Sequence, residues 1–171
     1  KITLMLKSKK GFIITGIVLA AITGGSFATW LIPQNHQSSI MISNPQDGLN
    51  ALVDQQKAIS ESDKTEFDKL LSGQITAENY ITIAEISSGQ IRSMIISITE
   101  PDVSEEWRQS YYLFGESLRA YNTYLRETIV IAQKIKENPT VNLTEDLGKI
   151  EQLLTQTQDS LIASNDSRPP N

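Results

Sequence analysis

The residues that could do chemistry are few and far apart. The sequence has one histidine, His36, and no cysteine. It can therefore form no disulfide, thiolate metal site or cysteine nucleophile, and no Ser–His–Asp set is credible from a single histidine. A copper site would have only His36 and Met41, and a metal ion needs several ligands. No Gly-rich phosphate motif occurs. We therefore predict no catalytic residue, no metal ligand and no cofactor; the chain is not expected to be an enzyme.

The distribution of charge separates the first residues from the rest. The net charge is −5, and all twenty acidic residues follow residue 32. The first ten residues contain only basic charges, from Lys1, Lys7, Lys9 and Lys10, and residues 33–171 carry eleven basic and twenty acidic side chains. Phosphate binding needs clustered Lys and Arg, so nucleic acid is not an expected partner.

An uncharged run separates these two parts. Residues 11–32 read GFIITGIVLAAITGGSFATWLI. As a helix these residues would span ~33 Å, enough for a hydrocarbon core of ~30 Å. Trp30 suits the membrane interface, and the lysines at the other end place that end in the cytoplasm. We expect a cytoplasmic basic arm (1–10), a transmembrane helix (11–32) in the cell membrane, and the rest of the chain outside the cytoplasm.

A secretory signal peptide is the alternative for this run. The basic start, the apolar stretch and the triplet Ser26-Phe27-Ala28 would allow cleavage after Ala28. The segment is present in the chain, so we expect a retained anchor in contact with the lipid bilayer.

Small residues recur at every fourth position of the predicted anchor, at Gly16, Ala20, Gly24 and Ala28. This spacing follows one face of a helix and allows a second helix to approach closely. We expect this face to contact a membrane helix of another subunit.

Beyond a linker (33–45), the sequence predicts a helical bundle (46–163) and a flexible tail (164–171). Proline and glycine divide the bundle region into four segments with helical periodicity. The segments are 46–72, 77–99, 104–137 and 144–163.

Local alternatives remain in two segments. The charged stretch 60–68 of the first could be a solvated part of the helix or a break in it, and the isoleucine-rich second segment could be a strand. Thr76 is a plausible N-cap for the second, and Glu105 and Glu106 suit the N-terminal end of the third. Apolar residues from Trp107 onward alternate by four and three, which favours core packing. The predicted fold is all-α, an antiparallel bundle of about four helices.

Two sequons for N-glycosylation occur in the expected outer part, in segments that we expect to be loop or tail. They begin at Asn142 (Asn-Leu-Thr) and at Asn165 (Asn-Asp-Ser). Both asparagines are candidate acceptors.

An anchor joined to a Cys-free helical domain rich in isoleucine, serine and threonine resembles small single-pass accessory subunits of archaeal membrane complexes of the ammonia monooxygenase type. The resemblance covers the layout of the whole chain and carries no diagnostic motif. It implies an accessory or scaffolding subunit that binds other membrane subunits, which would hold the copper. The alternative is a ligand-sensing ectodomain, similar in layout to chemoreceptor input domains.

Overall fold

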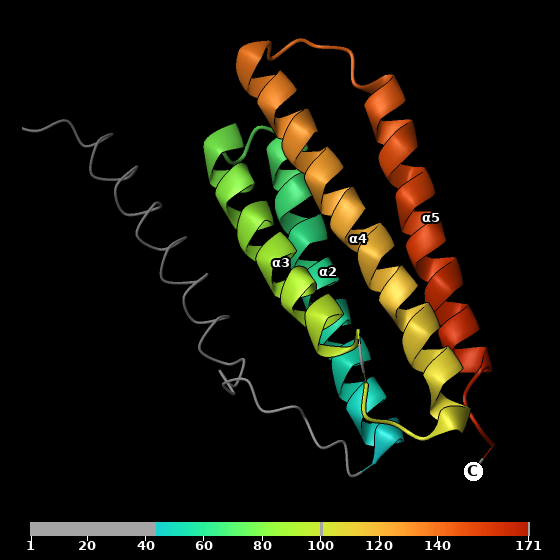
Figure 1. Ribbon diagram of the computed structural model, residues 1–171. Coiled ribbons are helices and arrows are strands. Elements are labelled where there is room, and N and C mark those ends of the chain that lie inside the picture. Colours follow the sequence, from blue (N-terminus) through green and yellow to red (C-terminus); the bar gives the residue numbers. More distant parts are fainter. Residues whose placement is uncertain (1–43, 100, 171) are drawn as a thin grey trace, which may run out of the picture. The chain divides into compact units, whose positions relative to one another are not determined.

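A computed structural model describes residues 44–99 and 101–170. All regular secondary structure in this part is helical. Consecutive helices run antiparallel and pack against one another as an up-down bundle (Figure 1). The predicted all-α class and four-helix bundle are thereby confirmed. The helices are α2 (Pro45–Leu71), α3 (Ala77–Ser97), α4 (Glu105–Glu137) and α5 (Thr144–Asp166).

The segments predicted to precede the bundle fall outside this description. The basic arm, the anchor at 11–32 and the linker up to residue 43 lie outside the described residues. None of the helices α2 to α5 combines the length and the apolar character needed to cross a membrane.

Local signals explain where α2 and α3 begin and how they are joined. Asn44 caps α2, its side chain accepting hydrogen bonds from two backbone N–H groups of the first turn, and Pro45 occupies the first helical position. Between the helices, Gly73 has a φ of 70°, which a residue with a side chain rarely adopts. Thr76 then caps α3 by accepting a hydrogen bond from the Asn79 N–H at 3.3 Å, as predicted.

The two segments with open alternatives are both continuous helices. Helix α2 runs through the charged stretch 60–68 without a break, because every fourth residue there faces the core: Ile59, Asp63 and Phe67 are all buried. Helix α3 is not a strand. Its buried residues recur at helical spacing, and its Tyr80 ring packs on Phe67 with centroids 5.4 Å apart.

Helix α4 is the axis of the bundle, because α2, α3 and α5 all pack against it (Figure 1). The four-three pattern predicted for this helix is its buried face. Nearly all of its members are shielded from solvent, and the central ones are fully buried. The buried members are Trp107, Tyr111, Phe114, Leu118, Tyr121, Leu125, Thr128 and Ala132.

Hydroxyl groups tie α4 to α5 and α2 within the core. The Ser117 hydroxyl accepts a hydrogen bond from the Gln56 side chain at 3.3 Å and donates one to the Thr157 carbonyl at 2.9 Å. About two turns before Ser117 on α4, the Ser110 carbonyl accepts a hydrogen bond from the Ser164 hydroxyl at 2.8 Å. Because serine is small, it lets the two backbones approach while its hydroxyl fixes their relative register.

The C-terminal end of α5 differs from the expectation of a tail from residue 164. The helix continues to Asp166, and Ser164 is fully buried against α4. Beyond it, the Arg168 guanidinium donates to the Asn50 side chain at 2.6 Å. These polar contacts hold the segment on the bundle, and a hydropathy pattern does not register them.

Asp63 is a buried carboxylate that joins three helices. It lies on α2, is 1% exposed, and accepts hydrogen bonds from Ser87 of α3 at 2.6 Å and from Tyr121 of α4 at 2.9 Å. Burial raises the pKa of Asp63 to about 6, with the negative charge of Glu66 adding to the shift and the two hydroxyl donors opposing it. Burial also raises the pKa of the neighbouring Tyr124 to about 12. The charged form of Asp63 is therefore costly in the folded state.

The raised pKa predicts how stability responds to pH. The folded state holds the Asp63 proton more tightly than the unfolded chain, so this group's contribution to stability is present at low pH. It is lost as the pH rises from 3.8 through about 6. Relative to wild type, Asp63→Asn should therefore gain up to ~3 kcal/mol of unfolding free energy across this range. Urea unfolding at a series of pH values measures this difference in unfolding free energy. Asp54→Asn, an exposed carboxylate on the same helix, is the control, and equal pH profiles for wild type and Asp63→Asn would contradict the assignment.

Removing the Ser117 hydroxyl tests the link between α2, α4 and α5. Ser117→Ala leaves the buried Gln56 amide without its acceptor, and the Gln56 Oε1 atom already lacks a partner. We expect a loss of about 1–3 kcal/mol of unfolding free energy. The control Ser93→Ala removes an exposed hydroxyl bonded within its own helix and should change stability by less than about 0.5 kcal/mol. Equal losses in the two variants would show that the buried link contributes nothing.

Candidate functional site

The residues predicted to pack in the membrane, Gly16, Ala20, Gly24 and Ala28, lie outside the described residues. Within residues 44–99 and 101–170, no group of three or more His, Cys, Asp or Glu side chains could hold a metal ion. The described part has surfaces that could bind another molecule.

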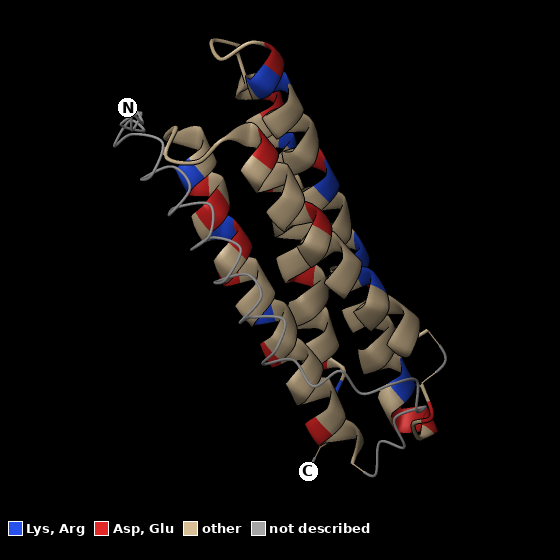
Figure 2. Cartoon of the chain, turned by 90° about the vertical axis from the view of Figure 1, so that its left-hand side faces the viewer, with Lys and Arg blue, Asp and Glu red and all other residues tan. Residues whose placement is uncertain are grey.

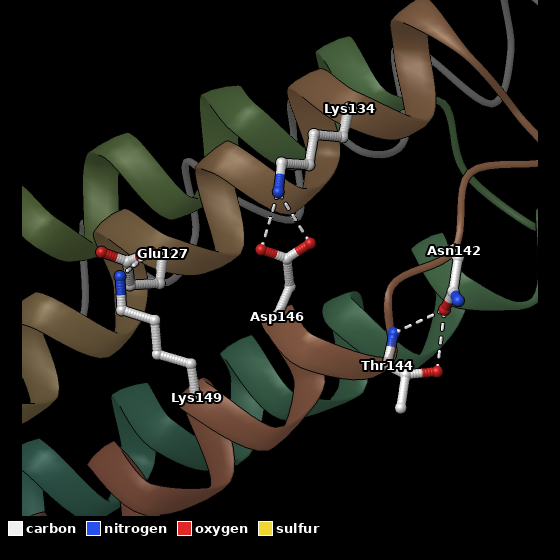
Figure 3. Close-up of polar contacts among 6 residues, drawn as sticks. All are labelled: Glu127, Lys134, Asn142, Thr144, Asp146 and Lys149. Carbon is white, nitrogen blue, oxygen red and sulfur yellow. Dashed lines mark hydrogen bonds and ion pairs between the residues drawn. The ribbon is translucent and has the colours of Figure 1, made fainter.

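The two sequons lie in different local structures. Asn142 is exposed in the connection between α4 and α5, and its side-chain oxygen accepts from the Thr144 N–H at 3.0 Å and the Thr144 hydroxyl at 2.8 Å (Figure 3). The amide nitrogen, where a glycan would attach, makes neither bond. Asn165 is also exposed but belongs to the last turn of α5, where the sequence predicts a flexible tail.

Ion pairs hold the two helices together near the Asn142 connection. Lys134 of α4 contacts both carboxylate oxygens of Asp146 at 2.8 Å, and Lys149 of α5 contacts Glu127 at 2.8 Å (Figure 3). The pairs are partly exposed, so each contributes little to stability. Neither pair involves Asn142, which stays exposed.

A cleft of about 490 Å³ lies beside the connection between α3 and α4. Ile98 and Thr99, at the end of α3, line one side with Pro101 and Asp102. A stripe along α4 lines the other side. Its members recur at helical spacing: Arg108, Tyr112, Gly115 and Arg119.

Gly115 forms part of the wall of this cleft. A Cβ atom at this position would lie 3.4 Å from the Arg119 Nη1 atom and 3.5 Å from the Ile98 Cδ1 atom. The arginine and the isoleucine therefore meet over the glycine. A glycine inside a helix costs roughly 1 kcal/mol relative to alanine, and here the arginine and the isoleucine pack closely against the position where a side chain would begin.

Among the residues that the structure describes, each arginine of the cleft contacts one glutamate. The Arg119 Nη1 atom contacts Glu116 at 2.5 Å, and the Arg108 Nη1 atom contacts Glu105 at 2.7 Å. Each guanidinium has five N–H donors, and these contacts use one nitrogen each. Tyr112 is 60% exposed beside them, so the cleft places two arginine side chains, each paired with a glutamate, next to an accessible aromatic ring.

A second surface lies on the outer side of α3. Thr82, Ile86, Gly89, Ser93 and Ile96 follow one helical face, which we call the outer α3 face. It contains no charge, Ile86 is 48% exposed and Ile96 is 75% exposed. Elsewhere acidic and basic residues are mixed along the helices (Figure 2). An uncharged face with two exposed isoleucines and a glycine between them suits a closely packed partner.

Comparison of the chain with protein-family models, with curated proteins and with solved structures finds no match of any kind. The cleft and the outer α3 face are the surfaces of the described residues that bear on function. Sequence reasoning missed both of them. The signal for the cleft was the spacing of Arg108, Tyr112, Gly115 and Arg119, which follows one face of the third segment. The signal for the outer α3 face was the absence of charge from residues spaced three or four apart between Thr82 and Ile96.

The local structures of the two sequons predict which asparagine is modified. In a eukaryotic secretory host we expect a glycan at Asn142, which lies in an exposed turn, and none at Asn165, which is held in a helix. Mass spectrometry should then show one glycan mass that disappears in Thr144→Ala and persists in Ser167→Ala. A glycan lost only in Ser167→Ala would reverse the assignment.

Proposed function

We propose that the protein is a non-catalytic, single-pass membrane protein that serves as an accessory or scaffolding subunit of a larger membrane complex. The basic arm would lie in the cytoplasm, residues 11–32 in the bilayer and the helical bundle outside the cytoplasm. The resemblance in layout to accessory subunits of archaeal ammonia monooxygenase-type complexes suggests the class of assembly. The observation that carries the proposal is the outer α3 face.

The chemistry of this face indicates what would cover it. Residues 82–97 contain only two charged side chains, Glu85 and Arg92, and helical geometry places both along one edge of the face. A partner would gain from burying Ile86 and Ile96, at ~25 cal/mol per Å² of apolar surface. The proposed partner is therefore an uncharged, apolar helix or surface of another subunit. The small anchor residues Gly16 to Ala28 would provide a second contact within the bilayer.

Gly89 allows a test that leaves the bundle intact. A side chain placed there would meet no atom within 4 Å, so Gly89→Leu should be accommodated and should gain helix propensity. The same side chain would project from the outer α3 face and hold a partner away. Gly148→Leu on α5 is the matched control, because its position is equally open.

We expect the wild-type chain to resist alkaline washing of membranes and, after mild-detergent extraction, to migrate with stoichiometric partner subunits. Native-gel mass spectrometry measures this. Gly89→Leu should lose the partners, and Gly148→Leu should keep them, with equal helical circular dichroism in all three proteins. Migration of the wild type only as a monomer or homodimer would overturn the accessory-subunit proposal. Retention of partners by Gly89→Leu would leave the outer α3 face without a role.

The cleft favours the second candidate function, a ligand-sensing ectodomain. A bound ligand could alter how the end of α3 packs on α4. This candidate also requires a response element coupled to the bundle.

A further inference from the structure

We propose that the cleft between the end of α3 and the stripe on α4 binds a small organic carboxylate with an apolar, preferably aromatic, body. The proposal concerns the bundle's own ligand and goes beyond a role as an accessory subunit. It rests on the joint position of Arg119, Gly115, Ile98 and Tyr112. The volume of about 490 Å³ falls within the usual ~300–1,000 Å³ of small-molecule sites.

Arg119 is the group that would bind the carboxylate. Its guanidinium lies over Gly115, beside the cleft, and its contact with Glu116 uses the Nη1 atom. The planar guanidinium can still present a second pair of donors to a carboxylate, in the bidentate geometry that arginine favours. The residue is about half exposed, so the carboxylate need not be buried to reach it.

Asp102 determines which end of the cleft receives the negative charge. It lies just before α4, near the end where Arg108 projects, while Arg119 is three helical turns further along, ~16 Å away by helical rise. The Asp102 carboxylate opposes an anion near Arg108. It therefore favours placing the ligand's carboxylate at Arg119.

The apolar body of the ligand would lie against Ile98 and Tyr112. Ile98 is buried at the foot of the cleft, and its Cδ1 atom approaches the position of a Gly115 side chain. Tyr112 presents an exposed ring on the same face of α4, one turn from Gly115. Gly115 lines the cleft near both groups and adds no side chain of its own to the wall.

Phenylacetate is the probe that tests this chemistry on the whole 171-residue chain. Its neutral amide, phenylacetamide, keeps the ring and removes the charge, and acetate keeps the charge and removes the ring. We expect saturable binding of phenylacetate with a Kd on the order of 1 mM. The two control compounds should bind about tenfold more weakly or not at all, since each lacks one half of the recognition. Ligand-observed NMR measures all three.

Variants locate the site. Arg119→Gln should weaken phenylacetate binding about tenfold, and it breaks only an exposed ion pair, so folding is preserved. Arg126→Gln, an exposed arginine seven residues further along α4, is the matched control and should bind as wild type. Gly115→Leu fills the cleft and should abolish binding, while Gly148→Leu should not. Absence of saturable phenylacetate binding, or equal affinity in the Arg119 and Arg126 variants, would overturn the proposal. Either result leaves the partner analysis of Gly89→Leu unaffected.

Discussion

The whole bundle depends on the burial of one long helix from three sides. Helix α4 contributes its four-three stripe of aromatic and aliphatic side chains to every part of the core, and the other helices pack around it. An apolar stripe of this kind supplies most of the favourable free energy, but it is tolerant of small shifts of one helix along another. Directional contacts are needed to select one arrangement. Asp63, Ser117 and Ser164 provide them, because each satisfies a polar group on a neighbouring helix at a fixed position.

The difference between the apolar stripe and the directional polar contacts explains what could be predicted from the sequence and what could not. Helical periodicity, proline and glycine at the connections, and caps such as Thr76 are local signals, so the four helices and most of their bounds were predictable. The buried polar contacts are not local. Helical spacing places Asp63 on the core face between Ile59 and Phe67. The sequence does not show which groups satisfy its carboxylate until Ser87 and Tyr121 are placed beside it. The burial of Ser164 was unpredictable for the same reason. The sequence around it is typical of a polar tail, but its hydroxyl donates a hydrogen bond to the Ser110 carbonyl of α4.

The candidate surfaces were harder to predict than the fold, for a related reason. A sequence pattern shows which face of α4 is apolar, and it treats the opposite face as solvated. The cleft arises where that polar face meets the end of α3 and the connection that follows, and this meeting is a tertiary property. Arg119 and Gly115 are four residues apart and were visible together, but the role of Ile98 depends on the packing of α3. The anchor residues Gly16 to Ala28 remain a prediction, because they precede the described part of the chain.

Three glycines lie within the helices, and two of them belong to the candidate binding surfaces. Gly89, Gly115 and Gly148 each lower helix stability, and at Gly89 and Gly148 nothing nearby requires a missing side chain. An open glycine is therefore not a site by itself, since Gly148 shares its helical face with the polar residues Thr144, Glu145, Glu151 and Gln152. Gly89 differs because its face is uncharged and carries exposed isoleucines, and Gly115 differs because an arginine and an isoleucine meet over it. The core and its buried hydrogen bonds hold the helices in place, which leaves these two positions free to shape a surface.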